Sequence, residues 1–180
     1  MKQEYSDIAA AQSELEAARQ RIRELEDRLA QQQVIIKALN EDHSFREGVI
    51  ERAAEGVCVC HDIPTHPFVK FTVWNHRMLE ITGYTMEEIN GNGWYQSMYP
   101  DPSVQERARE RMERMRKGDD LRFERWEITR RNGEKRSVAI STSVLTAADK
   151  SVHVLGLMHD FTEEERLQME ARIDDLTQVK

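Results

Sequence analysis

The alternation of apolar and polar residues is clearest in residues 121–162. Every second residue from Val138 to Val144 is β-branched, so one set of side chains lies on each face of a strand. Asn132-Gly133, just before this strand, predicts a two-residue hairpin turn, and a break at residues 147–150 predicts a second turn. The region therefore predicts a three-stranded antiparallel meander.

Residues 1–43 have a helical period instead and contain neither Pro nor Gly. Apolar residues recur about every 3.5 residues on average, as in a coiled coil. The predicted seam consists of Ile8, Leu15, Ile22, Leu25, Leu29, Ile36 and Leu39. Opposite charges at flanking positions favour a parallel, in-register homodimer, which Ala and Gln in the seam would weaken. The alternative is one amphipathic helix that packs on a globular core.

Residues 44–74 predict a short helix followed by two strands. Ser44 has a Glu three residues later, which is the spacing of a capping box and predicts a new helix start, and Gly56 can end this helix. Residues 57–60 and 68–74 are predicted strands, and the loop between them contains two prolines that cannot donate to a ladder.

Residues 75–118 predict helices again. One turn is expected over residues 78–81 and another over residues 86–89, capped by Thr85. A longer helix over residues 104–117 is expected to start at Ser103 as N-cap and to end at Gly118. With the meander, this order predicts an α+β fold: a five-stranded antiparallel sheet with short helices on one face and a small cavity between the two layers.

Composition narrows the class of protein. The chain has 180 residues, of which 33% are charged and 39% hydrophobic, and this polarity is explained by an extended helical segment added to one domain. The net charge of -7 argues against nucleic acid as the main partner. No apolar run reaches the roughly 18 residues of a membrane span, and the polar start is no signal peptide, so we expect a cytoplasmic protein. Cys58 and Cys60 are expected to be buried core cysteines and not a metal site or a disulfide.

Residues 45–162 resemble a PAS domain. The resemblance rests on five short motifs in the expected order: Asn75–Thr85, Trp94, Tyr99–Pro102, Arg131–Glu134 and Asp160–Thr162. In this family the last Asp pairs with a nearby basic residue, which implies an ion pair between Asp160 and Arg166, one helical turn away. Thr162 is predicted to cap the following helix with Glu165 as its box partner. Asp160, Thr162 and Arg166 are thus the residues expected to transmit a signal.

A PAS domain commonly holds a ligand in its cavity, and the resemblance gives Asn75, Trp94, Tyr95 and Trp126 as candidates. A non-covalent flavin or a small metabolite would suit such residues, whereas covalent flavin photochemistry lacks its Cys next to Asn92. Haem is not expected, because the helix over residues 104–117 contains no His. The alternative is a cavity filled by the domain's own side chains.

A second resemblance lies at the end of the chain. Asp174–Val179 is similar to the Asp-x-Leu-Thr segment that opens GGDEF diguanylate cyclase domains, which make cyclic di-GMP. We therefore expect three segments: a dimerisation coil (1–43), a PAS domain (44–162) and a linker helix (163–180) leading to an output domain. The chain shows no catalytic constellation and is not expected to be an enzyme by itself. The PAS part of a sensor histidine kinase and a ligand-free dimerisation adaptor are the alternatives.

Overall fold

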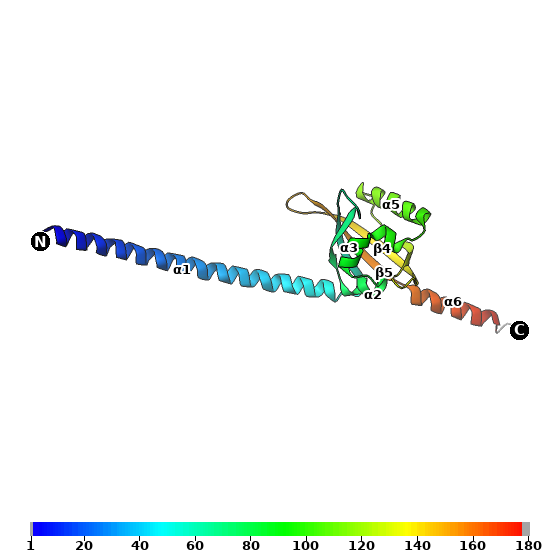
Figure 1. The fold of residues 1–180 in the computed structure, drawn as a ribbon. Coiled ribbons are helices and arrows are strands. Elements are labelled where there is room, and N and C mark those ends of the chain that lie inside the picture. Colours follow the sequence, from blue (N-terminus) through cyan, green and yellow to red (C-terminus); the bar gives the residue numbers. More distant parts are fainter. Residues whose placement is uncertain (1, 178–180) are drawn as a thin grey trace. The chain divides into compact units, whose positions relative to one another are not determined.

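The computed structural model describes the backbone of residues 2–177 and the side chains of residues 13–173. The chain divides into two compact units, one ending at Gly48 and the other beginning at Val49 (Figure 1). The side chain of Ile8 in the predicted seam, and those of Asp174–Thr177 in the second motif, lie outside the described residues, as do Gln178 and Val179 entirely.

Helix α1 (Lys2–Glu51) is one uninterrupted helix of 50 residues. The predicted break and new helix start at Ser44 are therefore wrong. Ion pairs one turn apart run through this region, with 2.9 Å between Arg46 Nη2 and Asp42 Oδ2. A cap residue stabilises a helix only where backbone N–H groups are free, and inside α1 those groups already have partners.

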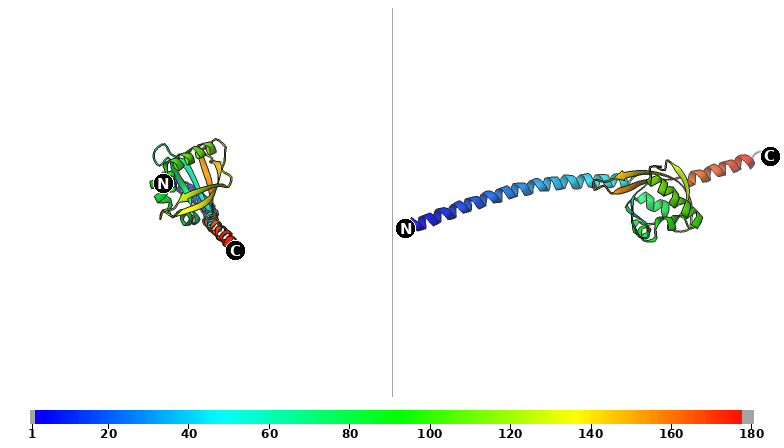
Figure 2. Two further views of the ribbon diagram at one scale, coloured as in Figure 1. Left: turned by 90° about the vertical axis from the view of Figure 1, so that its right-hand side faces the viewer. Right: turned by 90° about the horizontal axis from the view of Figure 1, so that it is seen from above.

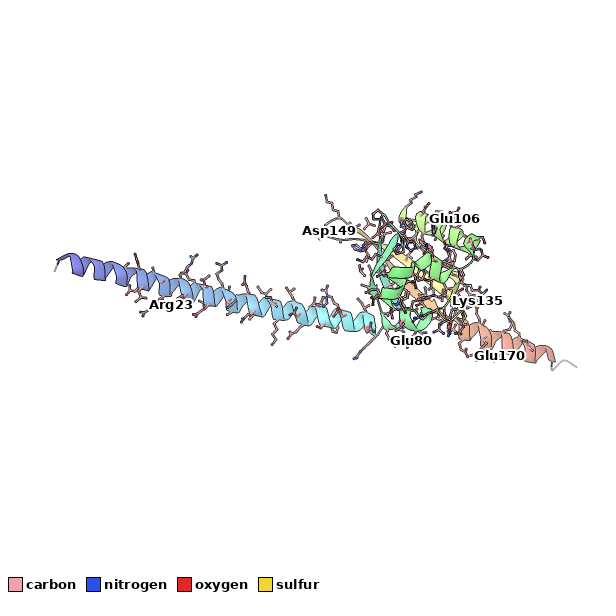
Figure 3. All side chains as sticks on the ribbon, viewed as in Figure 1. Arg23, Glu80, Glu106, Lys135, Asp149 and Glu170 are labelled. Carbon is pink, nitrogen blue, oxygen red and sulfur yellow. The ribbon has the colours of Figure 1, made fainter. Side chains whose placement is uncertain are left out.

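The described side chains of the predicted seam are all at least half exposed along α1. Their exposed fractions range from 50% for Leu15 to 62% for Leu39. On other faces of the helix, polar residues pair one turn apart, and Arg23 (Figure 3) donates to Gln20 at 2.8 Å. The single chain thus presents an uncovered apolar seam together with locally satisfied polar faces.

The second unit contains a five-stranded antiparallel sheet, as predicted. Its strands are β1 (Gly56–Asp62), β2 (Val69–Trp74), β3 (Glu124–Thr129), β4 (Lys135–Thr146) and β5 (Val152–Asp160). The spatial order is β2-β1-β5-β4-β3, and all neighbouring pairs are antiparallel. The predicted meander is confirmed as β3-β4-β5.

Short helices cover one face of this sheet (Figure 2). They are α2 (His76–Thr82), α3 (Met86–Asn92), α4 (Trp94–Met98) and α5 (Pro102–Arg116). The core lies between the two layers, where Met78, Ile89 and Met98 from the helices join Ile128 and Val138 from the strands. Helix α6 (Thr162–Thr177) follows β5. None of the helices within residues 2–177 combines the length and the apolar character needed to cross a membrane.

Two local predictions are corrected here. The β3-β4 connection is not a two-residue turn: Gly133 N–H donates to Arg130 O at 2.9 Å and Arg130 N–H donates to Glu134 O at 2.8 Å, so the turn uses residues 130–134. Of the Asn132-Gly133 pair, only Gly133 has a positive φ, of 84°. The Asn132 side chain accepts a hydrogen bond from Glu134 N–H at 3.0 Å. This bond between the Asn side chain and the backbone competes with the tighter turn.

The N-cap of α5 is Asp101 and not Ser103. The Asp101 carboxylate accepts from the N–H groups of Ser103 and Val104, and Pro102 takes the first helical position. Proline fits there because its fixed φ suits the helix and its missing N–H would have had no partner. A hydrogen bond from the Ser103 hydroxyl, at 2.7 Å, and the two bonds from the N–H groups hold the pKa of Asp101 below its usual range.

Candidate functional site

A small cavity of about 70 Å³ lies between the inner face of the sheet and helices α4 and α5. Trp94 and Tyr95 line it from α4, and Cys58 and Cys60 line it from β1. Two of the four predicted ligand residues, Trp94 and Tyr95, are therefore brought to the cavity. Its wall is almost entirely apolar, so it suits a small, weakly polar occupant.

Asn75 does not line this cavity. It is only 1% exposed, and its amide makes four hydrogen bonds to the backbone. Oδ1 accepts from the N–H groups of Val57 at 2.9 Å and Met78 at 3.0 Å. Nδ2 donates to the carbonyl oxygens of Ile50 and Glu55, both at 3.0 Å. Asn75 thus caps α2 and joins the last turn of α1 to β1, with no bond left for a ligand.

Trp126 does not line the cavity either. Its ring packs against Tyr99 with 5.6 Å between ring centroids, and Arg107 lies over its outer side at 5.2 Å. Trp94 belongs to the same aromatic cluster and lies 5.8 Å from Phe71 and 6.4 Å from Tyr99 between centroids. Tilted and edge-to-face contacts of this kind fix the rings in place.

The few polar groups at the cavity are held by the protein itself. Arg116 of α5 lines it and pairs with Asp62 at 2.6 Å. Burial raises the pKa of Tyr95, and it raises the pKa of Cys60 to about 12 and that of Cys58 still further, so both cysteines are neutral thiols at neutral pH. Thr142 adds one hydroxyl.

These features do not fit a flavin or a haem. Ligand sites of drug-sized molecules usually have volumes of roughly 300–1,000 Å³, several times the volume of this cavity. None of the described residues that line it is a His that could bind haem iron. Among residues 13–173, no cluster of three or more His, Cys, Asp or Glu side chains forms a metal site.

Sequence reasoning missed the contribution of α5 to the cavity. Met112, Met115 and Arg116 all line it. The two methionines belong to the apolar stripe of the predicted helix, but such a stripe does not distinguish a packed core position from a cavity wall. Similarly, nothing in the period of β5 singles out Met158, which completes the wall opposite α5.

A second candidate site is the junction between β5 and α6, and here the predicted ion pair is wrong. Asp160 pairs with Arg136 of β4, with 3.2 Å between Oδ2 and Nη1. Arg166 instead pairs with Glu163 and Glu170 of its own helix. Helical neighbours three and four residues away are closer to Arg166 than Asp160 is, while strand pairing places Arg136 beside Asp160.

The predicted capping box of Thr162 and Glu165 is also wrong. Thr162 Oγ1 accepts from Ser137 N–H at 2.9 Å and donates to Asp160 Oδ1 at 2.6 Å. Glu165 N–H donates to Phe161 O, and the Glu165 side chain pairs with Arg125 of β3 at 3.0 Å. The first turn of α6 is thus fixed to β3 and β4 through side chains.

Comparison with known proteins supports the family resemblance. Residues 71–158 match the family described as "PAS fold". No curated protein matches the chain. Among solved structures, the chain is similar to an RNA-binding light-oxygen-voltage receptor, with 17% identity and a TM-score of 0.54 over 76% of this chain and only 37% of that one.

Two further structures are isolated PAS domains. One comes from a two-component sensor histidine kinase, with 16% identity and a TM-score of 0.53 over 67% of this chain and 97% of that one. The other belongs to an HTR-like protein from Haloarcula marismortui, with 18% identity and a TM-score of 0.52 over 71% and 98%. At these identities the likeness shows the fold alone. Together with the family match and the strand order β2-β1-β5-β4-β3, it shows that the second unit of this chain has the PAS fold.

Proposed function

We propose that this chain is a sensory and regulatory module, in which the PAS domain responds to a small ligand or relays a signal and the flanking helices pass the response on. The observation that carries this proposal is the position of β5. Gly156 and Met158 of this strand line the cavity. His159 Nδ1 lies 2.9 Å from Glu55 Oε1, shortly after the end of α1, and Asp160 binds Thr162 at the start of α6. A shift of β5 would therefore act on both helix ends.

The N-terminal part of this function is dimerisation through a parallel coiled coil. The exposed seam of α1 and the charges that flank it support this arrangement. Sedimentation equilibrium of Leu29→Lys tests it, with Gln31→Lys as a control that adds the same charge outside the seam. We expect the unsubstituted chain and the control to be dimers and Leu29→Lys to dissociate; equal behaviour of the two variants would contradict a coil in this register.

The C-terminal part is transmission through α6. Disulfide crosslinking of Met169→Cys and of Ile173→Cys in the dimer reports which side of α6 lies toward the same helix of the other subunit. We expect Asp160→Asn to change the ratio of the two crosslinking yields, because it weakens the contacts that fix the first turn of α6. Arg166→Gln, on the helix surface, is the control. If Asp160→Asn leaves the ratio at its original value, the junction does not transmit.

We further propose a diguanylate cyclase as the output, on the basis of the segment that starts at Asp174. The chain itself is then a regulator and not an enzyme. A sensor histidine kinase is the second candidate, because PAS domains of such kinases are among the structural neighbours. Assays of the protein that carries the output domain distinguish them: cyclic di-GMP formation from GTP supports the first, and autophosphorylation with ATP supports the second. A passive PAS adaptor would show neither an occupied cavity nor a response in α6.

A further inference from the structure

The cavity has an unusual wall: sulfur-containing side chains line it from three different elements. The side chains are Cys58 and Cys60 of β1, Met112 and Met115 of α5, and Met158 of β5. The chain has two cysteines in total, so both of them are at this one site. This observation deepens the proposed function, because it identifies the class of ligand that the cavity would take.

The two cysteines are placed for a shared ligand and not for a disulfide. Both thiols are free, and they are two residues apart on the same face of β1, with an irregularity of the strand between Val59 and Cys60. Two residues of a strand span about 6.6 Å, near the long limit of the roughly 4.4–6.8 Å that disulfides allow between Cα atoms. Two metal–sulfur bonds of about 2.3 Å each let one ion bridge sulfurs up to about 4.6 Å apart, a wider range than the S–S bond of about 2.0 Å that a disulfide needs.

The other lining groups select for a soft ion. No carboxylate and no imidazole lines the cavity among the described residues, and its few polar groups are Thr142, Tyr95 and Arg116. Hard cations such as Mg²⁺ and Ca²⁺ require several oxygen ligands, whereas thiolate and thioether ligands favour cuprous copper. A cuprous ion between two thiolates carries one net negative charge, and the Arg116 guanidinium at the cavity, which also pairs with Asp62, offsets part of it.

We propose that this cavity binds one cuprous ion between the sulfur atoms of Cys58 and Cys60, with one or two thioethers from Met112, Met115 and Met158 completing a three- or four-coordinate site. Two Cu–thiolate bonds form and two S–H bonds break, so both protons leave to solvent; each thioether donates a lone pair of its neutral sulfur, and copper stays in the +1 state throughout. The ion would connect β1 to α5 and β5, and β5 is the strand that contacts both flanking helices.

The test is an anaerobic titration of the intact chain with tetrakis(acetonitrile)copper(I) in competition with bathocuproine disulfonate. We expect one copper per chain. Cys58→Ser/Cys60→Ser should lower the affinity by about a hundredfold or more, since it removes both thiolates. Met112→Leu/Met115→Leu keeps the side-chain volume and should lower it by a smaller factor. The matched control is Met86→Leu/Met169→Leu, which changes two exposed methionines outside the cavity and should leave the affinity unchanged.

Copper K-edge X-ray absorption of the unsubstituted chain gives a readout that does not depend on the folding of a variant. We expect sulfur ligands only. Nitrogen ligands, no binding against the chelator, or affinity that survives the loss of both cysteines would each overturn the metal site. The proposed sensory function can fail independently of the metal site. Copper binding without any change in α6 crosslinking would contradict signal transmission but support the metal site. A responsive α6 without copper binding would contradict the metal site but support signal transmission.

Discussion

The Asn75 side chain should be the largest single contributor to the stability of the PAS domain through hydrogen bonds. Asn75→Ala would leave the buried N–H group of Val57 and the carbonyl oxygen of Glu55 without their partner and would remove the side-chain cap of α2, whereas Met78 N–H would keep its 3.1 Å bond to the backbone oxygen of residue 75. Each buried N–H group left unpaired costs about 1–3 kcal/mol. The lost cap adds about 1 kcal/mol. We therefore expect a loss of about 3 kcal/mol in the free energy of unfolding, a large share of the roughly 5–15 kcal/mol typical of a domain.

Asn90→Ala is the matched comparison. The Asn90 side chain also bonds to backbone groups, but only to the N–H and C=O of Phe71, at 2.8 and 2.9 Å, on the edge strand β2. We expect this variant to lose about 1–2 kcal/mol. Asn75→Ser should fall between the two, because its hydroxyl can still cap α2.

Urea unfolding followed by tryptophan fluorescence measures all three variants, since the three Trp residues lie in the second unit and report on the domain and not on the coil. An Asn75→Ala cost below about 1 kcal/mol, or no greater than that of Asn90→Ala, would refute this reasoning. It would also return Asn75 to the list of residues free to contact a ligand.

Three other predictions concern Gly156, Asp160 and Asp101, whose contacts the structure specifies. A Cβ at Gly156 would lie 2.8 Å from Cys58 Sγ, so Gly156→Ala should cost about 1–3 kcal/mol of unfolding free energy. The double variant Gly156→Ala/Cys58→Ala should recover most of this loss. Gly48→Ala is the control: nothing lies within 4 Å of a Cβ there, so it should stabilise α1. Asp160→Asn should lower the free energy of unfolding by about 1.5–3 kcal/mol, while Arg166→Gln should leave the urea midpoint unchanged. If Arg166→Gln were the more destabilising of the two variants, the ion pair between Asp160 and Arg166 that the sequence predicted would be supported instead. Asp101→Ala should lower the thermal midpoint of unfolding at neutral pH more than Ser103→Ala does. The pKa of Asp101 is lowered in the folded chain, so its contribution to stability is present above the ordinary carboxyl pKa and is lost as the pH falls through the folded-state pKa. The difference in thermal midpoint between Asp101→Ala and the unsubstituted chain should therefore disappear in acid. A difference that stays constant with pH would argue against the cap.

The strands and short helices could be predicted because their signals are local. Thr85 caps α3 as predicted, the structure adds Glu88 as its box partner, and the break at residues 147–150 is a turn between β4 and β5. The wrong predictions share one cause, which is competition between signals of similar strength. Ser44 has the sequence of a cap but lies inside an uninterrupted helix, where the backbone N–H groups that it could bind already have partners. Asp101 and Ser103 are both cap residues, and the choice between them depends on Pro102.

The candidate sites were harder to predict than the fold. The rotation of α5 against the sheet decides whether Met112 and Met115 fill the core or line a cavity, and this rotation results from packing that no short motif encodes. The partner of Asp160 likewise depends on strand register, since Arg136 is 24 residues away in sequence and only 3.2 Å away in space. The family resemblance correctly indicated that Asp160 has a basic partner, but not which one.

Strand β5 is the element on which the sensory and the passive interpretations of this domain differ. Its residues have different roles: Gly156 and Met158 line the cavity, while the His159 ring packs against Phe123 and Phe161, with 5.9 and 6.1 Å between centroids, and reaches Glu55. A passive adaptor would need neither property, because a filled core and a fixed sheet edge would hold two copies together equally well. In a sensor both are required, since a change in what occupies the cavity must displace a strand that is bonded to the helices. Substitutions at Gly156 and at His159 therefore separate the two interpretations: in a sensor both change the crosslinking of α6, and in an adaptor both change only stability.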